Sequence, residues 1–219
     1  AINGEGFRRD APALALATIA LVGVSMTGEY GRIAGGLFLA ALAVYLGVAY
    51  VTEKRAAEAG RLDVPHQDPG PMMPSIAFSV AGLALLVVGA KLLVDGAIGV
   101  ATALNVSETL IGLTVVAVGT SLPELVTSVV ASLRGKSDIA FGNVVGSNIY
   151  NILGILGATA LIHPIAAPPD IVAFDNWVML SATAALILFA LTRRRIARWE
   201  GGLFVAGYVA YIGYLAATA

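Results

Sequence analysis

Residues 119–151 read GTSLPELVTSVVASLRGKSDIAFGNVVGSNIYN, and the fold follows from this stretch. A short basic link, RGKSD, joins two runs, 108–133 and 139–162, that are each apolar enough to cross a bilayer about 30 Å thick. Both runs nevertheless contain residues that hydrocarbon disfavours, with Glu124 near the middle of the first and Asn151 near the middle of the second. Because such groups are costly at this depth and usually functional, the stretch predicts two neighbouring membrane spans that carry a site.

The composition of the whole chain is that of a membrane protein. Its 219 residues are 58% hydrophobic and 12% charged, with a mean hydropathy of +0.86, whereas soluble domains carry about 45–50% apolar and about 25% charged residues. The net charge of −1 gives no basic field for a nucleic-acid partner. The absence of cysteine excludes disulfides, thiolate metal sites and cysteine nucleophiles.

Seven runs are long enough to span a bilayer, so we expect an all-α integral membrane protein with seven transmembrane helices. The runs are 11–28, 32–51, 75–100, 108–133, 139–162, 171–192 and 199–217. Residues 52–74 carry charges and four prolines, which predicts a linker between a two-span piece, 1–51, and a five-span piece, 75–219.

Lysine and arginine residues are distributed unequally between the two predicted sides of the membrane. Of the 13 such residues, eleven fall on the side of the N-terminus and the linker, Arg32 falls on the other side, and Lys91 lies inside a span. Because basic loops stay in the cytoplasm, we expect a cytoplasmic linker and a C-terminus that faces outward. The eleven are Arg8, Arg9, Lys54, Arg55, Arg61, Arg134, Lys136, Arg193, Arg194, Arg195 and Arg198.

The run 108–133 is expected to be a broken helix. Pro123 has no N–H to donate to the carbonyl of Gly119, and glycine weakens the same turn. Freed carbonyls at membrane depth are tolerated only where they line a cavity or meet a ligand. Oxygen-bearing side chains follow at spacings that place them on one helical face: Thr120, Ser121, Glu124 and Ser128.

The run 139–162 offers a second polar strip. Asn143, Ser147 and Asn151 are spaced four apart, with Asn148 beside them. Two small residues four apart, Gly142 and Gly146, would let another helix backbone approach. The short link makes the two runs antiparallel neighbours, so the strips can face each other. Mixed neutral and anionic oxygen ligands suit calcium or sodium rather than zinc or copper.

Single residues also have simpler interpretations. Serine and threonine in membrane helices usually hydrogen-bond to their own backbone, a proline kink is more often structural than functional, and a glutamate can pair with a lysine. Lys91, however, has its own partner four residues on, Asp95, and we expect these two to neutralise each other. The conjunction of glutamate, kink and two polar strips at matching depth favours a cation site.

The segment GTSLPELVTSVVASLRGKSDIAFGNVVGSNIYNILGILG resembles an α-repeat of the cation/calcium exchanger superfamily, specifically the prokaryotic sodium/calcium antiporters. The preceding VDGAIGVATALNVSETLIGLTVVAVGTS resembles the lead-in of the second repeat, so the resemblance covers about residues 80–162, with the repeat itself at 108–162. It implies a ten-span inverted-repeat fold with its site at the midplane. This chain would supply the last two spans of the first half and the whole second half. The missing N-terminal half, with the first α-repeat, would then be a partner.

The resemblance also implies a ligand set and a function. Residues matching the family's ion ligands are Glu124, Thr120, Ser121, Ala117 through its main-chain carbonyl, Ser147 and Asn151. With a second glutamate from the other repeat, the site would carry about two negative charges. The expected function is sodium/calcium antiport by alternating access, in the inner membrane of a prokaryotic cell.

Three other functions remain open. A proton/calcium exchanger is the nearest alternative, because a glutamate in the membrane can carry a proton. A passive cation channel would need no counter-ion. An enzyme is the least favoured class, because no nucleophile–base pair and no cofactor motif occurs; we expect Ca²⁺ and Na⁺ as transported ions and no cofactor.

Overall fold

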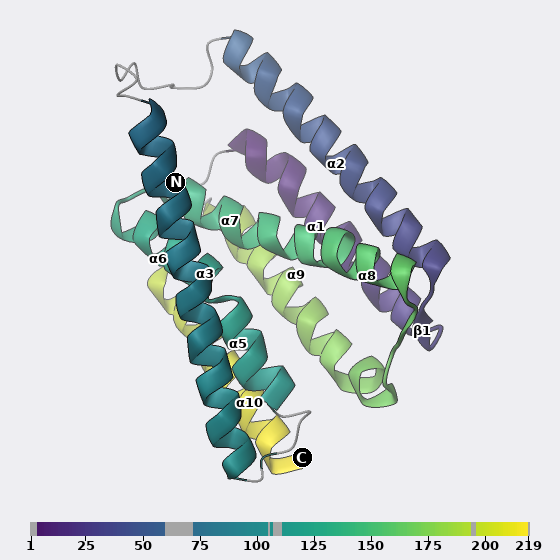
Figure 1. The fold of residues 1–219 in the computed structure, drawn as a ribbon. Coiled ribbons are helices and arrows are strands. Elements are labelled where there is room, and N and C mark those ends of the chain that lie inside the picture. The colour runs from purple at the N-terminus through teal and green to yellow at the C-terminus, as the bar shows by residue number, and fades with distance from the viewer. Residues whose placement is uncertain (1–3, 60–71, 105, 107–110, 194–195, 219) are drawn as a thin grey trace. The chain divides into compact units, whose positions relative to one another are not determined.

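The computed structural model describes residues 4–59, 72–104, 106, 111–193 and 196–218, and nearly all of them are helical (Figure 1). This confirms the all-α prediction, apart from two strands of two residues each. The described elements form two compact units. The first unit contains α1, α2, α7, α8 and α9 with their connecting segments, and the second contains α3, η1, α5, α6 up to Val130, and α10.

The first unit is a helix bundle. Its helices are α1 (Gly4–Ser25), α2 (Arg32–Glu58), α7 (Ser137–Tyr150), the π-helix η2 (Asn151–Leu156), α8 (Gly157–Ile162), the π-helix η3 (Ile171–Asp175) and α9 (Asn176–Arg193). α1 packs against α7 and α9, while α2 packs against η2 and α8. Val145 and Ile149 of α7 are almost completely buried, so α7 provides the centre of this core.

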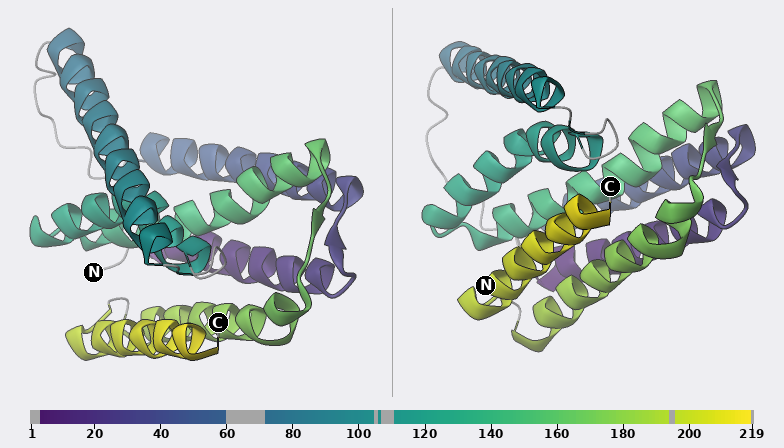
Figure 2. Two further views of the ribbon diagram at one scale, coloured as in Figure 1. Left: turned by 60° about the horizontal axis from the view of Figure 1, so that its bottom comes forward. Right: turned by 90° about the horizontal axis from the view of Figure 1, so that it is seen from below.

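Two connections meet at one end of the first unit (Figure 2). β1 (Glu29–Tyr30) follows α1, β2 (Ile165–Ala166) follows α8, and the two strands pair antiparallel. Beneath them the buried Asn176 amide donates a 2.6 Å hydrogen bond to Ser25 Oγ, which itself donates to the Val22 carbonyl at 2.7 Å. The buried polar groups are thus satisfied, and the end of α1 is tied to the start of α9.

A charged cluster ties the opposite ends of α1 and α2. Arg9 donates from Nε to Asp10 Oδ1 at 2.6 Å and from Nη1 to Glu53 Oε1 at 3.1 Å. The Tyr45 hydroxyl donates to Asp10 Oδ1 at 3.0 Å. Because α2 continues to Glu58, the first residues of the predicted linker are helical, whereas residues 60–71 lie outside the described residues.

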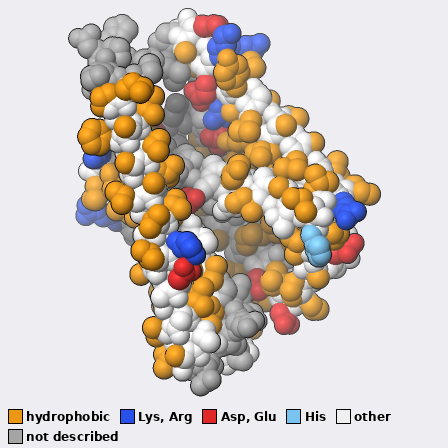
Figure 3. Space-filling view, viewed as in Figure 1, with side chains coloured by type: hydrophobic (Ala, Val, Ile, Leu, Met, Phe, Trp, Pro, Cys, Tyr) orange, Lys and Arg blue, Asp and Glu red, His pale blue; other side chains and the backbone are white. Residues whose placement is uncertain are grey.

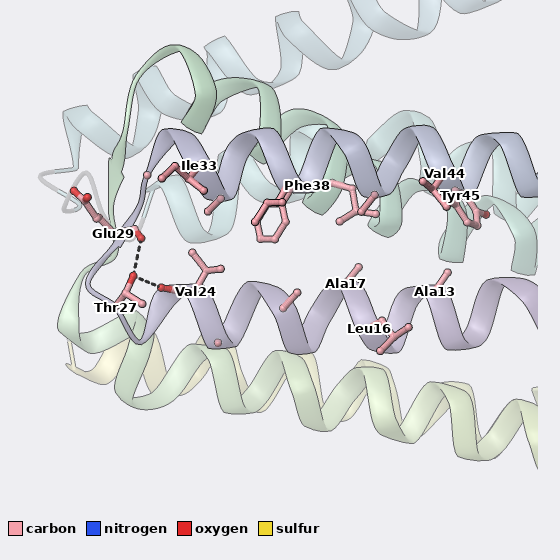
Figure 4. Close-up of a pocket in the computed structure, with 17 residues that line it drawn as sticks. Ala13, Leu16, Ala17, Val24, Thr27, Glu29, Ile33, Phe38, Val44 and Tyr45 are labelled. Atoms are coloured by element: carbon pink, nitrogen blue, oxygen red, sulfur yellow. Dashed lines mark hydrogen bonds between the residues drawn. The ribbon is translucent and has the colours of Figure 1, made fainter.

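The groove between α1 and α2 is apolar (Figure 4). It encloses about 930 Å³ and is lined by small and hydrophobic side chains such as Ala13, Ala17, Ile33 and Phe38. At one end Thr27 Oγ1 donates to the Val24 carbonyl at 2.7 Å and lies 3.1 Å from the Glu29 carbonyl. None of the predicted ligand residues lines this groove, so it is separate from the predicted site.

The second unit holds the longest helix. It consists of α3 (Met72–Ala103), the π-helix η1 (Gly112–Val116), α5 (Ala117–Thr120), α6 (Leu122–Leu133) and α10 (Arg198–Thr218). α3 packs against η1 and α5. The approach is closest at Gly119, where an added Cβ would overlap Val94 Cγ2 of α3. A glycine is therefore required at this contact.

Five helices among the described residues are long and apolar enough to cross a membrane, and a bent pair, Thr114–Thr120 with Leu122–Leu133, makes up to six. The five are Arg32–Glu58, Met73–Ala103, Ser137–Ile162, Ile171–Thr192 and Arg198–Thr218. The chain is thus an integral, multi-pass membrane protein. α1 is helical as expected, but its first two turns contain Arg8, Arg9 and Asp10, which shorten its apolar stretch. The count of seven spans therefore stays a prediction.

The closest helix crossing in the first unit lies between α2 and α8. A Cβ added to Gly35 would lie 2.5 Å from the Leu161 nitrogen and 2.6 Å from the Gly157 carbonyl oxygen. In contrast, a Cβ at Gly142 or Gly146 would meet no described atom within 4 Å outside its own helix. The close approach predicted for α7 thus stays a prediction, and the tight crossing between α2 and α8 uses Gly35 and Gly157.

We expect Gly35→Ala to destabilise the protein, because the new methyl group would push the α2 backbone away from α8. The expected loss is about 1–3 kcal/mol of unfolding free energy, measured as a lower thermal midpoint in detergent. Gly36→Ala is the matched control, since its Cβ would find only Leu161 Cδ1, at 4.0 Å. An equal loss in both variants would contradict the crossing.

Candidate functional site

The run 108–133 is broken, as the sequence predicts. The segments Thr114–Thr120 and Leu122–Leu133 are bent by 51° relative to each other. Ser121, between them, has a non-helical backbone with φ −91° and ψ 2°. Pro123 lies in the first turn of α6, where its missing N–H removes no intrahelical bond. Pro123 is thus compatible with the first turn of α6, although it prevents the preceding helix from continuing.

Glu124 lies in the first turn of α6, next to the break. The free N–H groups and the dipole at this end of a helix favour a negative charge, typically by about 0.3–1 kcal/mol. Its side chain is half-buried, and its Oε2 oxygen is buried. The carboxylate is therefore held at the bend rather than extended into the surroundings.

The hydroxyl of Thr120 is bonded to its own helix, as the simpler interpretation expects. Its Oγ1 donates to the Val116 carbonyl at 2.9 Å and lies 3.2 Å from the Ala117 carbonyl oxygen. The Ser121 N–H also donates to the Ala117 carbonyl, at 3.3 Å. The proton of Thr120 is thus directed at the backbone, which leaves the oxygen lone pairs of this exposed side chain directed elsewhere.

The second polar strip lies on the face of α7 away from its core. Val145 and Ile149 are buried, whereas Asn151 is exposed and Ser147 half-buried. Ser147 Oγ donates to the Val144 carbonyl at 3.1 Å, and Asn148 Nδ2 donates to the same carbonyl at 2.8 Å. Both side chains again direct their protons at the backbone.

Asn151 is the first residue of the π-helix η2, which sequence reasoning missed. A single π-helical turn widens the helix and shifts the register of the following residues, and such turns are frequent at functional sites. No residue type in NILGIL identifies this conformation in advance. The break in the first run was found because proline marks it chemically; the change of helix type in the second has no comparable marker.

The structure brings the predicted ligands together in two groups, one in each unit. Ala117, Thr120, Ser121 and Glu124 flank one bend in the second unit, while Ser147 and Asn151 lie one turn apart in the first. Among the described residues no three His, Asp or Glu side chains gather as a metal-binding group, so a cation here would rely on neutral oxygens beside Glu124.

Comparison with known proteins assigns these elements to a family. Residues 74–217 match the family described as sodium/calcium exchanger protein. The putative antiporter CaxA of Alkalimonas amylolytica is 36% identical over 220 residues, which cover 96% of this chain and 68% of CaxA. The sodium/calcium exchanger MaX1 of Methanosarcina acetivorans is 44% identical over 133 residues, covering 61% of this chain and 38% of MaX1.

A solved structure shows the same fold. The sodium/calcium exchanger from Methanococcus jannaschii superposes with a TM-score of 0.71 at 32% identity, covering 97% of this chain and 66% of that chain. This chain therefore spans about two thirds of the length of that exchanger and of CaxA. Together with the family match over 74–217, these likenesses show that the chain belongs to the sodium/calcium exchanger family.

Proposed function

We propose that this chain is part of a sodium/calcium antiporter that exchanges Ca²⁺ for Na⁺ by alternating access. The observation that carries the proposal is the 51° break at Ser121, with the carboxylate of Glu124 in the next helical turn. The printed names of MaX1 and of the Methanococcus jannaschii structure as sodium/calcium exchangers support the choice of ions. The two ions would compete for one site, so that each transport step carries only one kind of cargo.

The proposed ligands on this chain are six oxygen-bearing groups. They are Glu124, Thr120, Ser121, the Ala117 carbonyl, Ser147 and Asn151. Calcium takes 6–8 oxygen ligands, and a preceding half with the first α-repeat would complete the shell and add a second carboxylate. A hydroxyl that donates to a helix carbonyl can still offer its lone pairs to a cation. The hydrogen bonds of Thr120 and Ser147 are therefore compatible with ligation.

The remaining features of the proposal concern organisation and place. The ten-span fold would hold residues 1–51 as the last two spans of its first half, 52–74 as a cytoplasmic linker and 75–219 as its second half. α1 would serve as a span despite its charged start. The membrane would be the prokaryotic inner membrane, with the C-terminus outside. The protein would not be an enzyme and would need no cofactor.

Glu124→Gln tests the site directly. With the charge removed, calcium would be desolvated without compensation, so we expect at least about a 10–100-fold loss of transport, the range seen when a supporting residue of a metal site is removed. Glu124→Asp keeps the charge but withdraws it, and should retain a little activity. The measurement is sodium-gradient-driven calcium uptake into vesicles, using protein expressed from its complete gene.

Ser128→Ala is the matched control for Glu124→Gln, since Ser128 lies one turn farther along α6. It should change uptake much less. Parental uptake by Glu124→Gln would mean that the carboxylate is structural and would reject the proposed site. Uptake driven equally well by a proton gradient in place of sodium would favour a proton/calcium exchanger, and calcium flux without any counter-ion would favour a channel.

Pro123→Ala tests whether calcium transport needs the bend, independently of the stability of the protein. Alanine restores the N–H that can bond to the Gly119 carbonyl, so the two segments should straighten towards one helix. We expect a protein at least as stable to heat but with strongly reduced calcium uptake. A variant that transports at the parental rate would show that the bend is not needed for exchange.

Orientation can be tested with single cysteines, because the chain contains none. Lys136 and His163 are both exposed and lie at opposite ends of the segment Ser137–Ile162. A cysteine at Lys136 should react with an impermeant thiol reagent only from the cytoplasmic side, and one at His163 only from outside. The reverse pattern would contradict the orientation inferred from the basic residues.

A further inference from the structure

α3 carries a charged pair in an otherwise apolar span. Its mean hydropathy of 2.3 is the highest of the five candidate spans among the described residues. Lys91 Nζ donates to Asp95 Oδ2 at 2.9 Å, one helical turn apart. The two side chains remain 73% and 55% exposed, so the described residues do not cover the pair. In Figure 3, basic and acidic side chains lie side by side among the hydrophobic side chains along this helix.

The pair lies at membrane depth. The midpoint of the candidate span Met73–Ala103 falls near residue 88. At about 1.5 Å per residue, Lys91 lies roughly 5 Å and Asp95 roughly 10 Å beyond it, towards the C-terminal end of α3. Both positions fall within the half-thickness of about 15 Å of a hydrocarbon core. An ion pair exposed to lipid at this depth is unfavourable even when its charges neutralise each other.

The same turn of α3 reaches the broken helix. Val94 lies between Lys91 and Asp95 in sequence, and its side chain occupies the space that a Cβ of Gly119 would need. Lys91 and Val94, three residues apart, are neighbours on the helix surface, and Asp95 lies about 100° around the helix from Val94. The charged pair is therefore exposed beside the contact that Val94 makes with Gly119, two residues before the bend at Ser121.

Exposed charge at membrane depth beside an interrupted helix indicates water. Charged residues within spans usually face a bundle interior or a water-filled cavity, and interrupted backbone at this depth is found where it lines one. A route for a hydrated cation needs the same surroundings, together with a negative charge that attracts the ion. The two observations, on α3 and on the segment that follows it, thus agree.

We propose that Lys91 and Asp95 line the aqueous route between the outer solution and the break at Ser121. The Asp95 carboxylate attracts the incoming cation. When no cation is passing, Lys91 pairs with this carboxylate. The two residues position the ion and its water rather than binding the cargo at the transport site. This inference rests on the proposed exchange function and on the proposed outward position of the C-terminal end of α3.

The test compares the two faces of the membrane. Asp95→Asn, Lys91→Met and the double variant are expressed from the complete gene, and calcium KM is measured with right-side-out and inverted vesicles. Asp95→Asn should raise the outer KM roughly three- to tenfold at low ionic strength, as expected for one charge acting on a divalent ion, and less at high salt. Lys91→Met should lower the outer KM. The inner KM should not change in either variant.

Lys54→Met and Glu58→Gln provide the matched control, because this exposed pair on α2 has the same spacing, with 4.0 Å between charged atoms. Neither should alter the outer KM. The inference is overturned if both faces respond equally, if neither responds in an active protein, or if each single variant loses folded protein while the double variant restores parental KM. A parent protein without cation flux would overturn the proposed function and this route together.

Discussion

Hydrocarbon offers the peptide backbone no hydrogen-bonding partner, and this constraint governs every polar feature of the chain. A helix satisfies its own backbone groups, so an uninterrupted apolar span needs nothing else at membrane depth. A bend of 51° at Ser121 departs from that solution. The chain limits the consequences in two ways: the Ser121 N–H donates back to the Ala117 and Val118 carbonyls, and Pro123 lies in the first turn of the next helix. What remains at the bend is a carboxylate in a favourable helix-terminal position.

Each unit packs with its apolar side and leaves the residues of its polar strip outside its own core. In the first unit, Val145 and Ile149 are buried while Asn151 is exposed. In the second, Gly119 is buried against Val94 while Thr120 and Ser121 are exposed. Polar surface of this kind is unsuitable for contact with lipid. Under the proposed function it would face ions and water.

A residue type predicts structure reliably where it has a definite physical consequence. Pro123 and Gly119 predicted the break, because one lacks a donor and the other a side chain. Lys91 and Asp95 predicted their own pairing through helical spacing, and the structure confirms it at 2.9 Å. The long apolar runs predicted helices that the structure contains.

Other features depend on tertiary contacts that no local pattern encodes. Gly142 and Gly146 have the spacing of a helix-packing motif, yet the crossing in the first unit is made by Gly35 and Gly157, which lie far apart in sequence. The π-helical turn at Asn151 lies in a segment that packs against α2 and α1, and no residue type within it marks the change of helix type. The bond from Asn176 to Ser25 joins residues 151 positions apart. Predicting such features requires the three-dimensional arrangement first.

The hydrogen bonds of the hydroxyl groups bear on whether the polar strips are structural or functional. A serine or threonine whose hydroxyl is hydrogen-bonded to its own helix is usually regarded as having no further function. A hydroxyl has one proton and two lone pairs, so a hydrogen bond to the backbone uses the proton and leaves the lone pairs available. Thr120 and Ser147 both do this, through Val116 and Val144, at 2.9 and 3.1 Å. With the proton fixed away from the exposed side, each oxygen presents only negative charge density outward. The arrangement that explains the residue structurally is thus also the one that a cation requires, and the two interpretations of these residues do not compete.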